Sequence, residues 1–193
     1  NVISINTGVM ATAESFPIDF DSEEVAKAAG TTLSDLQNAG DRSVAVEKMG
    51  VGAANIISRL LTDGSAHGAI GMGGGGGTYI ALSAMQSIPM GVPKLCVTTL
   101  AAKDLTRQLG VKDITLMPSI VDVAGLNNIS RMVIRQAAGA IAGMMAANVQ
   151  ETKESTGSIA ISIFGNTTKC VDKCSEILKE DGYDVSTFHS VGI

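Results

Sequence analysis

Five consecutive glycines, Gly73 to Gly77, are the part of this sequence that points most directly to chemistry. Glycine loses more backbone entropy on folding than any other residue, so a run of glycines suits a place where the backbone approaches something closely or adopts a positive φ. A short apolar run precedes the glycines, and Thr78 and a segment of small residues follow them. Between a strand and a helix, such a turn typically binds an anion through backbone N–H groups and the helix N-terminus. We therefore predict a phosphate-bearing ligand, held by Gly73, Gly74, Gly75, Gly76, Gly77 and Thr78.

The glycine run fits neither of the two common nucleotide motifs well. Gly71–Gly76 satisfies the pattern G-x-G-x-x-G, but a run of glycines satisfies almost any glycine pattern. The acidic residue that would bind a ribose after the next strand is not evident. The lysine of a P-loop is absent, because Thr78 and Tyr79 follow the last glycine. The sequence thus favours phosphate binding in another geometry, with a purely structural tight turn as the alternative.

Further polar residues follow other expected strands. Thr98 and Thr99 end the strand that begins at Lys94, and they are either additional ligand contacts or plain β-branched strand residues. In a second polar turn, Asn166, Thr167 and Thr168 have hydroxyl and amide groups that suit a phosphate or a ribose. The alternative for this turn is an N-cap of the following helix, which the sequence supports equally well.

Two residues are candidates for acid–base chemistry. His189 ends an expected strand and is the histidine on the expected ligand edge, and Asp104 follows the strand that begins at Lys94. Solvated charge is the alternative for Asp104, and a polar contact is the alternative for His189. The sequence shows no Ser/His/Asp or Cys/His arrangement and no metal-ligand spacing, so the catalytic residues stay unknown and no metal is expected.

Composition limits the classes of partner. The chain has 193 residues, a formal net charge of −5, 45% apolar residues and only 3% aromatic residues. A negative charge without a basic cluster disfavours nucleic acid as a partner. No apolar run approaches the ~20 residues that span a bilayer, so a membrane is not an expected partner. Cys96, Cys170 and Cys174 are an odd number of cysteines without paired spacing, which favours buried free thiols in a reducing cytoplasm over metal or redox roles.

The apolar pattern alternates between strand-like and helix-like periods. It predicts strands over 2–6, 68–72, 94–99, 113–117, 159–164 and 185–189. It predicts helices from 21 to about 30 and over 32–38, 42–62, 78–86, 127–149 and 169–180. This alternation is typical of an α/β fold, a three-layer sandwich with a mainly parallel sheet and helices on both faces. Ligands bind such sheets beyond the carboxyl ends of the strands, where the polar turns described above would converge on one edge.

Several segments resemble one family. Gly71–Thr78, Ile88–Lys94, Lys112–Thr115, Val121–Asn127 and Phe164–Thr168 are similar, in sequence and spacing, to segments of the Tm-1-like ATP-binding family, also called UPF0261. Phe16-Pro17 and Gly40-Asp41-Arg42 fit the same pattern. Members are about twice as long and have two Rossmann-like subdomains. The resemblance implies a single Rossmann-like α/β domain over residues 1–193, a fragment that makes up most of the first subdomain of a longer protein.

The resemblance also bears on function. It implies ATP binding at the glycine run, whereas the antiviral action of one plant member depends on a partner surface that no motif here records. We therefore expect a nucleotide-binding domain with ATP as its ligand. One alternative is an enzyme that acts on a small phosphorylated or carboxylated metabolite, and another is a protein-interaction module with a structural nucleotide. Exposed helices of small residues favour a homo-oligomer.

Overall fold

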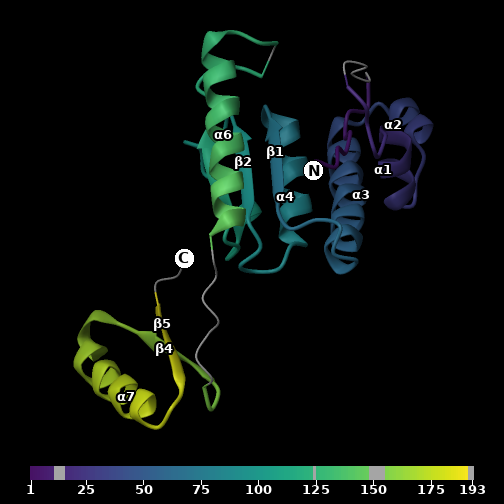
Figure 1. Ribbon diagram of the computed structural model, residues 1–193. Coiled ribbons are helices and arrows are strands. Elements are labelled where there is room, and N and C mark those ends of the chain that lie inside the picture. Colours follow the sequence, from purple (N-terminus) through teal and green to yellow (C-terminus); the bar gives the residue numbers. More distant parts are fainter. Residues whose placement is uncertain (11–15, 124, 148–154, 191–193) are drawn as a thin grey trace. The chain divides into compact units, whose positions relative to one another are not determined.

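The computed structural model describes residues 1–10, 16–123, 125–147 and 155–190. Internal contacts divide the chain into two compact units, Asn1–Ala147 and Asn148–Ile193, and each unit contains its own sheet (Figure 1). The family resemblance implied one domain over residues 1–193, and the division into two units differs from that expectation. A single apolar pattern cannot show it, because strand and helix periods look alike whichever sheet a strand joins.

The sheet of the first unit has three parallel strands in the order β1-β2-β3. These are β1 (Ala69–Gly73), β2 (Lys94–Thr98) and β3 (Thr115–Pro118), and Ala69 pairs with Lys94 while Leu95 pairs with Thr115. All five residues of the central strand β2 are buried. Burial on both faces is what its continuous apolar sequence predicts for a parallel strand.

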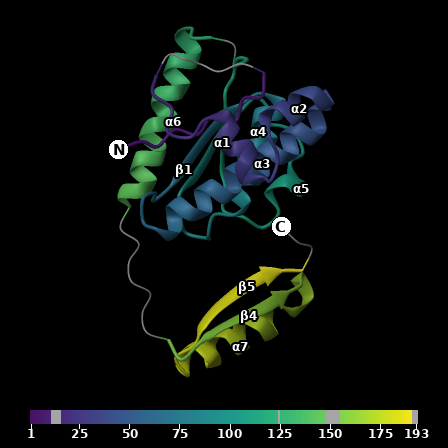
Figure 2. The same ribbon diagram turned by 90° about the vertical axis from the view of Figure 1, so that its right-hand side faces the viewer.

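Helices cover both faces of this sheet (Figures 1 and 2). On one face, α4 (Gly75–Gln86) contacts β1 and β2, and α3 (Arg42–Thr62) packs on α4. Two short helices, α1 (Ser22–Ala28) and α2 (Leu33–Ala39), lie against α3. On the other face, α6 (Asn128–Ala146) packs on β2. A single turn, α5 (Thr106–Leu109), lies between β2 and β3 in the chain. The predicted parallel α/β fold with three layers is therefore confirmed.

Local signals set most helix boundaries. The Asp41 carboxylate accepts hydrogen bonds from Ser43 N–H and Val44 N–H, and α3 matches its predicted range residue for residue. Asn127 caps α6 in the same way. The last predicted residues of that helix, 148 and 149, lie outside the described residues. The predicted strand over 2–6 is replaced by a single bridge between Ile5 and Phe20.

The second unit is one β-α-β element. Its parallel strands are β4 (Ser158–Ile163) and β5 (Asp184–His189), and a 3₁₀ turn, η1 (Gly165–Thr167), leads into α7 (Thr168–Glu180) between them. Alternate residues of β4, the isoleucines at 159, 161 and 163, are half-buried, whereas the residues between them are exposed. In the described part of the chain, no helix combines the length and the apolar character needed to cross a membrane.

Candidate phosphate-binding site

The glycine run forms the junction between β1 and α4 rather than a separate loop. Gly73 is the last residue of β1, Gly74 is the N-cap with φ −73°, and Gly75–Gly77 form the first turn of α4. The helix therefore begins three residues earlier than the predicted start at Thr78. None of the five glycines has a positive φ. The described glycines with a positive φ are all in other parts of the chain. Of the two reasons expected for the run, unusual backbone angles and close approach, only close approach remains.

The glycines differ in what surrounds them. A Cβ on Gly73 would lie 2.6 Å from the Cα of Gly77 and 2.8 Å from the backbone nitrogen of Thr78, so the fold requires glycine at that position. A Cβ on Gly76 would lie 3.3 Å from the Arg42 guanidinium. A Cβ on Gly75 would meet no described atom within 4 Å. Packing and backbone angles therefore explain Gly73 but not Gly75.

Thr78 and Thr98 hold this junction together from inside the core. Both side chains are fully buried, and their hydroxyl oxygens are 2.5 Å apart. The Thr78 hydroxyl donates to the Gly73 carbonyl at 3.1 Å, so Thr98 donates to Thr78 and accepts from the Leu100 N–H. This chain of bonds places the two hydroxyls in the core and away from the turn surface. Thr99 is exposed, and its N–H donates to the Gly73 carbonyl at 3.4 Å.

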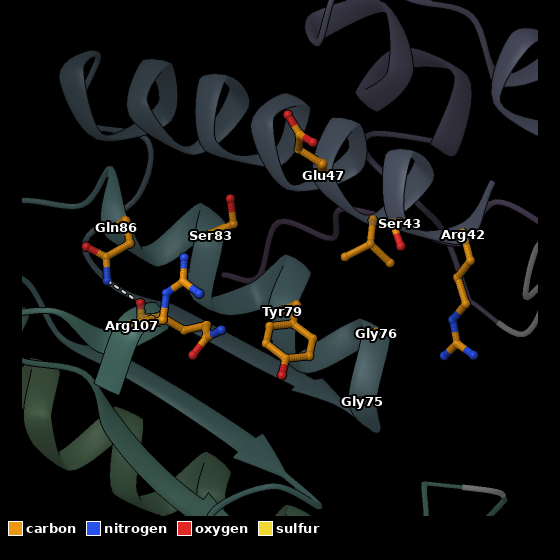
Figure 3. Close-up of a pocket in the computed structure, with 11 residues that line it drawn as sticks. Arg42, Ser43, Glu47, Gly75, Gly76, Tyr79, Ser83, Gln86 and Arg107 are labelled. Atoms are coloured by element: carbon orange, nitrogen blue, oxygen red, sulfur yellow. Dashed lines mark hydrogen bonds between the residues drawn. The ribbon is translucent and has the colours of Figure 1, made fainter. Parts of the chain in front are cut away.

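The surface of the junction is electropositive on the side of α3. Gly74 has no side chain that could accept the N–H groups of the first turn of α4, and helix N-termini carry partial positive charge. Figure 3 shows Arg42 reaching from the start of α3 to the level of Gly75 and Gly76. Asp122 is the carboxylate near the N-cap, with its Oδ1 3.8 Å from the Cβ position of Gly74.

A groove of about 630 Å³ continues from this turn along α4. Arg42, Gly75, Gly76, Tyr79 and Arg107 are among its lining residues (Figure 3). The sequence alone did not predict that Arg42, Tyr79 and Arg107 belong to the site. Gly40-Asp41-Arg42 was part of the family resemblance, but a contact between α3 and α4 leaves no signal in local spacing. The groove has the size of typical small-molecule pockets.

The second polar turn is in the other unit, so the structure does not bring it to the same sheet edge as the glycine run. Thr167 Oγ1 accepts from the Phe164 N–H and donates to the Phe164 carbonyl, both at 3.0 Å. Thr168 donates to the Gly165 carbonyl at 3.0 Å, and Asn166 is exposed. The threonine hydroxyls thus bond within their own turn, and Thr167, the N-cap of α7, makes no side-chain capping hydrogen bond to that helix.

The two acid–base candidates also belong to different units. Asp104 accepts hydrogen bonds from the Thr106 hydroxyl and N–H at the start of α5. These bonds, the hydroxyl first, lower the pKa of Asp104, so its carboxyl stays ionised at neutral pH and is a poor general acid. His189 is the last residue of β5 in the second unit.

All three cysteines are free thiols. Burial raises the pKa of Cys96 to about 11, so this thiol is neutral and unreactive at physiological pH. Cys170 and Cys174 on α7 are also free but exposed, so the expectation of buried thiols is met by Cys96 and not by these two. Within the described ranges, no cluster of three or more His, Cys, Asp or Glu side chains has a geometry that could hold a metal ion.

The fold and the glycine-rich strand-to-helix junction define a Rossmann-like α/β domain. Residues 1–150 match the model for the uncharacterised protein family UPF0261 N-terminal domain, and residues 156–193 match that for the C-terminal domain of the same family. The chain belongs to the UPF0261 family, as its motifs predicted.

Individual relatives agree with this assignment. A UPF0261 protein of Clostridium tetani is 40% identical over 190 residues, which cover 98% of this chain and 47% of the relative. UPF0261 protein mlr3387 of Mesorhizobium japonicum is 40% identical over 91% of this chain and 43% of its own length. The tomato (Solanum lycopersicum) ToMV resistance protein Tm-1(GCR237) is 34% identical over 79% of this chain and 21% of the relative. The chain spans less than half the length of these relatives.

Proposed function

We propose that this chain binds a nucleotide, with ATP as its ligand, through the first turn of α4. The N–H groups of Gly75, Gly76 and Gly77 would donate to phosphate oxygens, and Arg42 would pair with the same phosphates. The observation that carries the proposal is the open space at Gly75, since neither packing nor backbone angle requires glycine there. A bare first turn beside an arginine is suited to close approach by an anion.

The other residues predicted to contact the ligand have different roles in this proposal. The buried hydroxyls of Thr78 and Thr98 shape the junction, and Thr99 is at its exposed rim. Asn166, Thr167 and Thr168 belong to the second unit and are not used here. From the sequence, we also propose that the protein forms a homo-oligomer and is located in the cytoplasm. We propose further that it binds neither nucleic acid nor a membrane.

Titration calorimetry with ATP, ADP and pyrophosphate tests the proposal. Gly75→Val places a branched side chain in the open space and should abolish binding, while circular dichroism should show unchanged helix content. Gly139→Val is the matched control, because Gly139 is a helical glycine on α6 whose Cβ would also meet no described atom within 4 Å. If the wild type binds none of these compounds at millimolar concentration, the proposal fails. If Gly75→Val binds as well as the wild type, the run is structural.

A further inference from the structure

The groove beside α4 extends well beyond the glycine turn. Its volume is about 630 Å³, which is more than a phosphate group needs. It is formed by α3, α4 and α5, with the glycines at one end and Gln86, Arg107 and Gln108 at the other. Gln86 fixes the far end, because its amide nitrogen donates to the carbonyls of Gln108 and Leu109 at 2.6 and 2.8 Å. This space can accommodate the part of a ligand that follows its phosphates.

The charge of the groove favours an anionic ligand, although the chain as a whole carries −5. Arg42 and Arg107 both line it, and neither guanidinium has a carboxylate within 4.0 Å among the residues that the structure describes. Glu47 is the acidic residue in the lining, and Figure 3 shows its carboxylate directed away from Tyr79. Arg42 and the N-terminus of α4 make the glycine end the stronger anion site.

Tyr79 provides an aromatic surface between the two ends of the groove (Figure 3). Gly75 and Tyr79 are four residues apart on α4, so they lie on the same face of the helix, about 6 Å apart along its axis. The Tyr79 side chain is 39% exposed, which leaves its ring accessible.

We infer that the groove binds a nucleoside polyphosphate with its base stacked on Tyr79 and its phosphates at Gly75, Gly76 and Arg42. This inference rests on the proposed function and adds the basis of specificity. The base contact distinguishes nucleotides from inorganic phosphates and sugar phosphates, which lack an aromatic ring. Stacking on a tyrosine tolerates every base, so the groove selects nucleotides as a class.

A comparison of ATP with tripolyphosphate tests the base contact. Tripolyphosphate carries the phosphates without the base, and both compounds are titrated into the wild type, Tyr79→Ala and Arg42→Gln. Tyr79→Ala should weaken ATP binding roughly ten- to hundredfold and leave tripolyphosphate binding unchanged. Arg42→Gln should weaken both. Ile129→Ala is the matched control, because Ile129 is a large helical side chain of similar exposure, 41%, on α6.

Tyrosine fluorescence gives a second readout that packing alone would not change. The chain has no tryptophan and two tyrosines, so Tyr183→Phe leaves Tyr79 as the reporter and Tyr79→Phe leaves Tyr183. ATP should quench Tyr79 in the first variant more than tripolyphosphate does. In the second variant, any loss of Tyr183 fluorescence reports only the light that ATP itself absorbs. Tyr183 should show no further quenching.

The outcomes separate this inference from the proposed function. If ATP binds the wild type, Gly75→Val abolishes binding and Tyr79→Ala has no effect on it, the groove does not bind the base and the inference is overturned while the proposed function stands. If tripolyphosphate binding falls as much as ATP binding in Tyr79→Ala, Tyr79 supports the turn rather than the base, which also overturns the inference. If neither compound binds the wild type, both proposals fail.

Discussion

Each end of the β1-β2-β3 sheet has a positively charged side chain nearby, and the two side chains differ in burial and in hydrogen-bond partners. At the amino end, Lys94 is fully buried, and its Nζ donates to the Pro89 and Val92 carbonyls at 2.8 and 2.6 Å and to Asp113 at 2.8 Å. At the carboxyl end, Arg42 is exposed beside the glycine turn and has no ion-pair partner in the described part of the chain.

The difference distinguishes a structural cation from one that is available to a ligand. An ammonium group has three donors, and those of Lys94 are all used within the fold. A guanidinium group has five donors, and the open groove leaves those of Arg42 accessible. Substitutions at the amino end should therefore lower stability without changing ligand binding, and substitutions at Arg42 or Gly75 should change ligand binding without lowering stability.

Asp113→Asn should have the largest effect on stability. It removes the negative partner of a buried ammonium, and the loss of one member of a buried pair typically costs 3–5 kcal/mol. Because the Asp113 side chain is 38% exposed, we expect the lower end of that range, about 3 kcal/mol. Urea denaturation measures the change in the free energy of unfolding.

Asp172→Asn is the control for this prediction, since Asp172 is exposed on α7 and should change stability little. Below the unfolding transition, Asp113→Asn should bind ATP with the affinity of the wild type. A loss of ATP affinity in the folded variant would contradict the separation of the two ends.

Gly73→Ala should be the next most destabilising change, by about 2–3 kcal/mol, because overpacking usually costs this much. The new Cβ would lie 2.6 Å from backbone atoms of Gly77, which cannot move without disturbing the start of α4. Thermal and urea denaturation measure the loss.

Gly75→Ala is the matched variant two residues further along the same run. Its Cβ would enter open space, and alanine is the better helix former, so stability should rise by up to ~1 kcal/mol. Equal destabilisation by both substitutions would show that the whole run is required for packing.

Acid should remove part of the stability at the amino end. Partial burial raises the pKa of Asp113, but hydrogen bonds from Lys94 and the Gly91 N–H outweigh it and hold that pKa below its usual value. A carboxyl with a lowered pKa stabilises the fold above its unfolded pKa of about 3.9, and this contribution disappears as pH falls through the folded pKa.

The difference in unfolding free energy between the wild type and Asp113→Asn should therefore shrink below about pH 4. Urea denaturation of both proteins between pH 7 and pH 3 measures it. A difference that stayed constant over this range would mean that the Asp113 charge contributes nothing.

Ile120→Asn should give a small gain at the carboxyl end. Ile120 has φ 66°, a conformation that disfavours β-branched residues, and the Val121 N–H donates to the Ser119 carbonyl across it at 2.7 Å. The side chain is 68% exposed, so little packing is lost, and asparagine should raise stability by about 1 kcal/mol. A lower melting temperature than that of the wild type would show that the Ile120 side chain contributes more than its exposure implies.

The sequence by itself determined the elements, the fold class and the family. Cap residues such as Asp41 and Asn127 and the apolar periods of α3 and β2 are local signals, and they predicted these elements to within a residue or two where the structure describes them. The segment over 2–6 failed because a strand needs a partner along its length, and Ile5 finds one only at Phe20.

Only the tertiary structure decided which residues face the glycine turn. Thr78 was predicted from its place after the glycines, but its hydroxyl forms a hydrogen bond with Thr98, the last residue of β2, and is buried in the core. Arg42 reaches the turn through the packing of α3 on α4, and Tyr79 lines the groove that this packing forms. Contacts between elements distant in the chain leave no trace in local spacing. Local spacing could therefore predict the turn but not the arginine and tyrosine beside it.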